Sequence, residues 1–369
     1  MNGPVQRIAI GAGIHAAEWL VSTRAGQELL AAAHRVVPRP RCMCVAGGVE
    51  MYVGRRGRHY YVARMPGSGL MHADDCESLE HSGLLSGAHT YAPGAIVEDA
   101  QGRLCLAANL NRLERQPPPL TEVNIAGLLD VLVEQADLNR FALGEVDRSW
   151  LSIRERLVGA AESILLEGRV LANDLFLPTR YDRAQGPELL AECQAFIARH
   201  DRALLCAPLK EVRATQYGWQ LVLKHLPGLR LWVAAELAQT LAIRHGYDAL
   251  AVPPPFALCL VAVRPGRRDG NYTVTNLASL RTDRHYFPSG SEQQDAVATD
   301  LLTKGFSLLR PLRFDSPPDA ALADFAILHD SGPEPVFVLN ETPDDPRRAL
   351  VAVMQRNHGR MRVFLEPDA

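Results

Sequence analysis

The sequence predicts a multidomain α+β protein, and three observations support this fold class. At 369 residues and 47% hydrophobic composition, the chain can bury more core than a single domain usually holds. Runs with helical periodicity alternate with strand-like runs along the whole length. Proline-rich stretches separate them, most clearly at 117–119. We expect an N-terminal β-hairpin, central helical and β segments, and a C-terminal αβββαβ domain.

These stretches divide the chain into five segments. Residues 1–40 are predicted to form a strand and a helix, and residues 41–116 a hairpin module with a β extension. Residues 120–185 are mainly helical, and residues 186–288 are mixed and rich in strands. Residues 289–369 form the αβββαβ domain.

The first segment contains a glycine motif after a strand-like run. Val5 to Ile10 has the pattern of a strand, and Gly11 to Ala16 matches G-x-G-x-x-A, which lays a pyrophosphate on a helix N-terminus. A dinucleotide-binding oxidoreductase is therefore a minor alternative. After the helix, however, Pro38 and Pro40 lead straight into cysteines, so the second strand and acidic residue of such a fold are missing.

Four potential zinc ligands bracket the predicted hairpin. Cys42 and Cys44 stand two apart before it, and His72 and Cys76 stand four apart after it. Tetrahedral Zn²⁺ takes four soft donors from separate chain segments, and two antiparallel strands alone are marginal in water. We therefore expect a structural zinc site that stabilises the hairpin. The alternative is a surface His72, with the three cysteines as buried apolar side chains.

The hairpin region is strongly basic, although the whole chain has a net charge of −3. Residues 35–64 hold seven arginines and one acid, a net charge of +6, interleaved with Tyr52, Tyr60 and Tyr61. A surface that follows phosphates and stacks on bases has this composition. The alternative is a solvated face or a contact with a protein partner. The candidate DNA-binding residues are Arg41, Arg55, Arg56, Arg58, Arg64 and Tyr60.

The central segments combine helices and strands. Helices are predicted at 122–138 and 149–166, followed by a strand-like run at 169–177. This order is compatible with a winged helix whose second helix directs Arg154 and Arg156 outward, but paired helices more often form a plain core. Farther along, the pattern is mostly β, with strands predicted at 220–224, 230–233, 256–263 and 272–277.

The C-terminal segment has the most regular pattern. Helices are predicted at 292–304 and 345–357, and strands at 307–312, 324–329, 335–339 and 361–365. This αβββαβ order is that of the PD-(D/E)xK nucleases, in which acids on the second and third strands hold Mg²⁺ and a lysine orients the attacking water. The candidate catalytic acids are Asp324, Glu341 and, on the first helix, Glu292.

The expected lysine does not follow Glu341. The domain is therefore either a Mg²⁺-dependent nuclease with a displaced lysine or a nuclease-like fold without the chemistry. A third alternative is structural, since Asp324 also suits the start of a strand and Glu341 the N-terminal region of a helix.

The composition places the protein in the cytoplasm. The longest apolar run, Phe256 to Val263, is too short to span a bilayer, so we expect no membrane contact. His15 and Glu18 interrupt the apolar stretch near the N-terminus, which argues against a signal peptide. Seven cysteines in such a chain are better explained by reduced thiols and a metal site than by disulfides.

Several of these motifs resemble the domain of unknown function 1173 family. The likeness is clearest in Arg39 to Cys44, Glu50 to Tyr52, and Arg64 to Gly69 with His72 and Cys76. The family pattern places a glutamate inside the third C-terminal strand, where this chain has Val338, which implies weak Mg²⁺ binding. Further matches are Asp137 to Phe141, Ser149 and Trp150, Phe306 to Arg313, and Ala323 to Phe325.

The resemblance implies a protein carried by bacterial integrative and conjugative elements, with other element-encoded proteins as partners. Its plan of a zinc hairpin and a nuclease-like domain is similar to that of competence proteins that act on incoming single strands. The leading hypothesis is thus a DNA-associated protein of a mobile element. The alternative is a protein-interaction or structural component without a nucleic-acid role.

Overall fold

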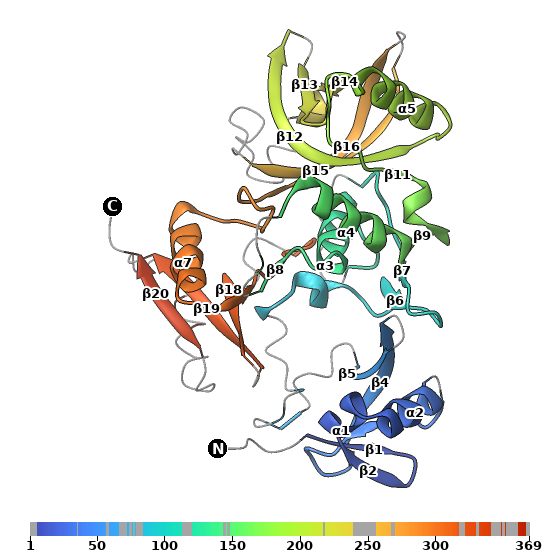
Figure 1. Ribbon diagram of the computed structural model, residues 1–369, viewed down its shortest axis with the longest axis vertical. Coiled ribbons are helices and arrows are strands. Elements are labelled where there is room, and N and C mark those ends of the chain that lie inside the picture. The colour runs from blue at the N-terminus through green and yellow to red at the C-terminus, as the bar shows by residue number, and fades with distance from the viewer. Residues whose placement is uncertain are drawn as a thin grey trace.

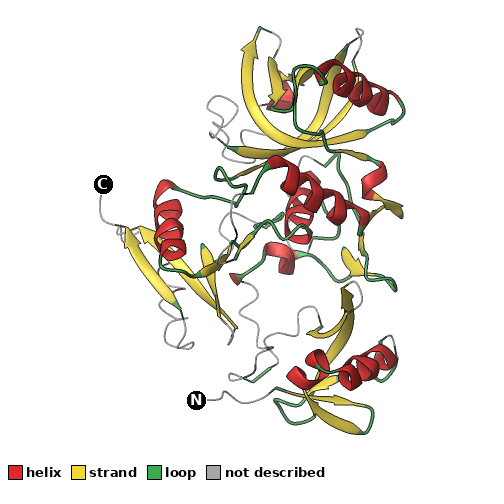
Figure 2. Ribbon diagram, in the orientation of Figure 1, coloured by secondary structure: helices red, strands yellow, loops and turns green. Residues whose placement is uncertain are grey.

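The computed structural model is a mixed α+β protein whose strands form four sheets within the described residues (Figures 1 and 2). The residues described are 6–34, 36–56, 59–65, 72–73, 76, 78, 84–112, 120–142, 145, 148–216, 218–238, 256–266, 270–316, 322–329, 332–340, 348, 351 and 361–366.

The N-terminal unit is a five-stranded sheet in the order β2-β1-β3-β4-β5, covered by two helices. Its strands are antiparallel, and Val49, Met51 and Val53 alternate into a small core with Leu20 and Leu30 from the helices. The elements are β1 (Arg7–Ile10), β2 (Gly13–Ala16), α1 (Ala17–Ser22), α2 (Arg24–Ala33), β3 (Arg41–Cys42), β4 (Val49–Arg56) and β5 (His59–Arg64).

The glycine motif does not form the predicted turn between a strand and a helix. Ile10 pairs with Gly13 across a tight hairpin, and Gly11 has φ 58°, a backbone conformation that glycine adopts without strain. The residues after the turn continue as β2 rather than entering a helix. That expectation is therefore wrong, and the geometry on which a pyrophosphate would rest is not formed here.

The two predicted central helices are confirmed as α3 (Ile125–Gln135) and α4 (Trp150–Glu162). The side chain of Asn124 caps α3, and that of Ser149 caps α4. The hairpin that follows α4 joins strands from before α3, because β9 lies parallel to β7. This second sheet contains β6 (Ile96–Glu98), β7 (Leu104–Leu106), β9 (Ile164–Leu166) and β10 (Arg169–Val170).

The predicted strand at 169–177 is interrupted. A 3-10 turn, η4 (Leu171–Asn173), separates β10 from β11 (Leu175–Phe176), which pairs with the next sheet instead. The two helix arginines also have local partners. The Arg154 Nε donates to the Leu177 carbonyl at 2.8 Å, and Arg156 pairs with Glu145 at 2.6 Å.

The third sheet closes on itself as a barrel, which lies beside α5 at the top of Figure 1. Its first strand pairs with both the second and the fourth strands. Helix α5 (Gly186–Ala198) was not predicted, and neither was the long first strand. The strands are β12 (Ala203–Thr215), β13 (Gly218–Leu223), β14 (Leu226–Ala234), β15 (Ala257–Pro265) and β16 (Asn271–Arg281).

The C-terminal sheet has the order β20-β19-β18-β17-β8. Most of the predicted elements are present, and β19 and β20 are parallel. The predicted helix at 345–357 falls mostly outside the described residues. The elements are α7 (Glu292–Thr303), β17 (Ser307–Leu309), β18 (Phe325–His329), β19 (Gly332–Asn340), β20 (Arg362–Glu366) and β8 (Arg140–Phe141), contributed by the chain after α3.

Candidate functional site

The four predicted metal ligands lie together. Cys42 is on β3, and Cys44 lies in the turn that follows this strand. His72 and Cys76 lie beside them, and the four ligand atoms all lie within 4.8 Å of one another. This is the only such group of three or more His, Cys, Asp or Glu found in the part of the chain that the structure describes.

The spacing of the donors fits a tetrahedral zinc ion. Zinc bonds of about 2.3 Å to sulfur and 2.0–2.1 Å to nitrogen place two sulfur ligands about 3.8 Å apart and a sulfur and a nitrogen about 3.6 Å apart. The Sγ atoms of Cys42 and Cys76 are 3.5 Å apart. His72 Nδ1 lies 3.3 Å from the Cys44 Sγ and 3.6 Å from the Cys76 Sγ. The four side chains can therefore supply all the ligands of a tetrahedral metal ion.

Hydrogen bonds to sulfur support the cluster from outside. The Gln6 Nε2 donates to the Sγ of Cys42 at 3.5 Å and of Cys76 at 3.8 Å. Backbone amides of Ala73 and Ser78 donate to Cys44 and Cys76. Such donors stabilise thiolate charge and orient the ligands. Gln6 was missed because a lone glutamine near the N-terminus has no metal-binding signature in sequence.

The electrostatics of the cluster favour a neutral state without a cation. Burial raises the pKa of the Cys76 thiol to about 12 and also raises the pKa of Cys42. Burial and the nearby Arg64 lower the pKa of His72. A bound divalent cation would deprotonate these thiols, so metal binding there releases protons.

The predicted nucleic-acid residues occupy two different places on the N-terminal unit. Arg55 is exposed, lies opposite Tyr60 across the hairpin, and has its guanidinium 5.7 Å from that ring centroid. Arg64 pairs opposite Met51 at the base of the hairpin. Arg41 lies on β3, where its side chain is 47% exposed and donates to the Gly48 carbonyl. Arg58 and the Arg56 side chain lie outside the described residues.

The other two tyrosines do not share this surface. Tyr52 and Tyr61 lie on the opposite face of the hairpin, and the Tyr61 ring covers Gly54, where a Cβ would come within 2.3 Å of it. Burial, and to a lesser degree Tyr61 and Glu98, raise the pKa of Tyr52. All three tyrosines are partly buried, and Tyr60 packs against the small core of this unit, so their availability for stacking stays a prediction.

Among the candidate catalytic acids, Asp324 is 5% exposed and lies just before β18. One carboxylate oxygen accepts from the Val338 amide at 2.7 Å, and the other accepts from the Gln294 side chain. Val338 itself is 2% exposed. Glu292 is exposed in the first turn of α7. Glu341 lies outside the described residues.

Hydrogen bonds from neighbouring residues occupy both carboxylate oxygens of Asp324, so this arrangement differs from an open metal site. The Gln294 amide oxygen accepts from Arg310 at 2.9 Å, and the Arg310 guanidinium lies 4.5 Å from the Phe325 ring centroid. The Asn139 side chain in turn donates to the Arg310 carbonyl. Asp324 therefore belongs to a chain of contacts that joins α7, the sheet and the segment after α3.

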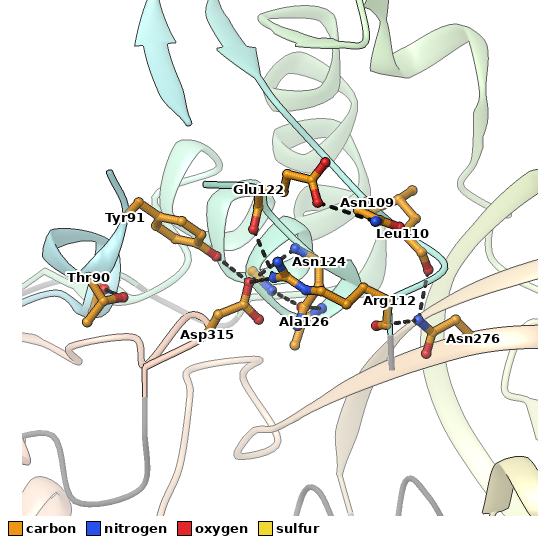
Figure 3. A network of polar contacts seen from close by, with 12 residues as sticks. Thr90, Tyr91, Asn109, Leu110, Arg112, Glu122, Asn124, Ala126, Asn276 and Asp315 are labelled. Atoms are coloured by element: carbon orange, nitrogen blue, oxygen red, sulfur yellow. Dashed lines mark hydrogen bonds and ion pairs between the residues drawn. The ribbon is translucent and has the colours of Figure 1, made fainter. Parts of the chain in front are cut away.

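A second polar network was not predicted from the sequence (Figure 3). An Asp315 carboxylate oxygen accepts from the Tyr91 hydroxyl at 2.6 Å, from Arg112 at 3.3 Å and from the Asn124 amide at 3.1 Å. The Arg112 and Asp315 side chains are 7% and 5% exposed. The network joins segments that are about two hundred residues apart, so no local pattern could have revealed it. Three donors converge on one buried carboxylate oxygen, which indicates a structural role.

Comparison with known families gives one result. The family model described as "Protein of unknown function (DUF1173)" matches residues 15–365. A search of curated proteins finds no match. Among the described residues, no helix is both long and apolar enough to cross a membrane.

Proposed function

The chain belongs to the DUF1173 family, and from the chemistry of its N-terminal unit we propose that it is a DNA-associated protein of a mobile genetic element. In this proposal, zinc at Cys42, Cys44, His72 and Cys76 stabilises the fold of a basic hairpin that contacts DNA. The single observation that carries the proposal is the tetrahedral spacing of those four donors at the base of an arginine-bearing hairpin.

The position of the cluster supports a structural rather than catalytic metal. All four coordination positions are supplied by the protein, and structural zinc sites are closed in this way. The ligands join β3 to residues 72–76, on either side of the hairpin in sequence. The metal would thus hold Arg41 and Arg55 on one small rigid unit, where each can meet phosphates from its own face of the sheet.

The C-terminal domain is proposed to be nuclease-like but inactive. Its sheet order and the parallel β19–β20 pair support the predicted αβββαβ plan. The hydrogen bonds to both oxygens of Asp324, together with the apolar Val338, support loss of the Mg²⁺ site. Incubation of purified protein with plasmid and Mg²⁺ or Mn²⁺ tests this, and cleavage abolished in Asp324→Ala would overturn it.

The DNA proposal is tested by fluorescence anisotropy with labelled oligonucleotides at increasing salt. Binding should weaken with salt, by about 0.7–0.9 in the log–log slope for each phosphate contact. Arg41→Ala with Arg55→Ala should lower both affinity and slope. Arg24→Ala is the matched control, because that side chain is 93% exposed on α2 of the same unit. No binding at low salt, or binding without salt dependence, would refute the proposal.

An alternative function is protein interaction, favoured by apolar side chains exposed on the N-terminal unit. Ile14 is 55% exposed and Val21 48% exposed, and Trp19 stacks on His15 at the surface. Co-purification of another protein encoded by the same element, together with no detectable DNA binding in the anisotropy assay, would favour this alternative.

A further inference from the structure

The closed barrel has a specific strand arrangement. Strand β12 pairs antiparallel with both β13 and β15, and β13 pairs with β14. Strand β14 then lies parallel to β16, which pairs with β15 and closes the ring. In chain order this is 1-2-3-5-4 with return to 1, a five-stranded Greek-key barrel of the OB-fold type. Residues 235–238, after the third strand, are helical.

Two parts of the barrel wall are already covered. The outward side chains of Leu258, Leu260 and Ala262 on β15 join the core that contains α3 and α4. Helix α5 contributes Leu189, Cys193 and Ile197 to the barrel interior. The outer face of β13 and β14 takes no part in either core, so its chemistry has to be explained separately.

A polar row crosses that outer face. Leu231 and Val233 point into the barrel, so Trp232 between them points outward, because side chains alternate along a strand. Its cross-strand neighbours continue the row on both sides. From one end to the other, the row consists of Arg213, Gln220, Trp232, Thr273 and Arg264.

The row combines an aromatic centre with basic ends. Arg213 and Arg264 are exposed, and so is Arg230, which lies two residues before Trp232 on the same side of β14. Within the described residues of the strands β12 to β16, the one acid is Glu211, which pairs with Arg213. Four strand spacings separate the ends, about 19 Å. Positive charge at this spacing is complementary to a chain of phosphates.

Trp232 is partly exposed, and the part of it at the surface is the ring rather than the N–H. Its Nε1 is buried. A ligand on this face would therefore meet the apolar, aromatic part of the indole, which is the part that stacks on a base.

We infer that this face binds single-stranded nucleic acid. One base stacks on the exposed part of the Trp232 indole, while Arg213, Arg230 and Arg264 follow the backbone. A duplex would not fit, since its bases stack on one another and offer no free ring face. The strand 2–3 face is also where barrels of this type bind oligonucleotides, a likeness of fold that raises the expectation. This site lies on a different surface from the basic hairpin.

The test is anisotropy with a labelled oligothymidylate of about 16 nucleotides, the upper site size for one such barrel. Trp232→Ala should weaken binding roughly 5- to 150-fold, and Trp232→Phe should retain most of it, because stacking needs only an aromatic face. Arg230→Ala should reduce the salt slope by about 0.7. Arg183→Ala is the control, since Arg183 is exposed between β11 and α5 and lies on none of the strands that form the row.

The outcomes separate the two surfaces. Loss of affinity in Trp232→Ala and Arg230→Ala, with Arg183→Ala unchanged, supports the barrel site. Unchanged binding in both barrel variants, with loss in Arg41→Ala and Arg55→Ala, overturns this inference but leaves the hairpin proposal standing. A duplex that binds as tightly as the single strand also overturns it. Circular dichroism checks folding, and if Trp232→Ala is unfolded, the exposed Arg230→Ala decides the question.

Discussion

The buried carboxyl group of Asp130 is expected to make the stability of the protein depend on pH. The Asp130 side chain is 8% exposed on α3, and one oxygen accepts from the Phe314 amide at 2.6 Å. Burial, and to a lesser degree the carboxylates of Asp315 and Glu134, raise its pKa from 3.8 to about 7, although the Phe314 hydrogen bond opposes this. The group is therefore protonated in the folded protein over a pH range in which it is ionised in the unfolded chain.

The sign and size of the effect follow from this difference. A carboxyl whose pKa is higher in the folded state favours folding below the unfolded pKa and loses that advantage as the pH rises to the folded value. A difference of one pKa unit corresponds to about 1.4 kcal/mol, so a rise of about three units in the pKa of Asp130 amounts to about 4 kcal/mol. The free energy of unfolding should fall by this order between about pH 4 and pH 7 because of Asp130 alone.

Asp130→Asn isolates this contribution. The amide oxygen can still accept from the Phe314 N–H, but the side chain stays neutral at every pH. Urea denaturation followed by circular dichroism from pH 4.5 to 8 should show a variant that is more stable than wild type at pH 8 and nearly equal at pH 4.5. Comparing the two proteins cancels the other titrating groups, and Asp201→Asn, at an exposed position, is the control. Parallel pH profiles, or a variant less stable at pH 8, would refute the reasoning.

Three further predictions concern packing and the metal. Gly127→Ala should destabilise the protein by about 1–3 kcal/mol, because the added Cβ would lie 2.1 Å from the Tyr91 hydroxyl. Gly159→Ala on α4 should stabilise the protein by about 0.5–1 kcal/mol, because no atom lies within 4 Å of the added Cβ. Thermal melts compare the two variants. Trp150→Phe removes the 2.9 Å bond to the Pro178 carbonyl and should cost about 1 kcal/mol in the same assay. Purified protein should hold about one zinc per chain, which Cys42→Ser or a chelator removes while lowering the stability of the N-terminal unit; metal-free protein of unchanged stability would contradict this.

Local patterns predicted much of the secondary structure. The hairpin β4–β5 was recognised from alternating apolar residues. Helix α7 and the strands of the C-terminal sheet were recognised from periodicity and turns. Helices α3 and α4 were recognised from apolar periodicity, and Ser149 caps the second of them. These features are readable because they depend on residues within a few positions of one another.

The failures share one cause. Gly11 to Ala16 has the pattern of a strand-to-helix turn, but pairing of β2 with β1 outweighed it. The predicted strand at 169–177 broke because its second half pairs with β12. In each case a tertiary contact competed with a local preference and prevailed.

The sequence by itself predicted the four residues of the candidate metal site and the order of the described C-terminal elements, because ligand spacing and periodicity are properties of neighbouring residues. Only the tertiary structure decided that β12 closes a barrel by pairing with strands on both sides, and that Trp232 shares one face with Arg213 and Arg264. Only the tertiary structure also decided which hydrogen bonds Asp324 accepts and that Asp315 is buried. These contacts join residues far apart in the chain, and their free energy depends on how the elements pack rather than on any segment alone.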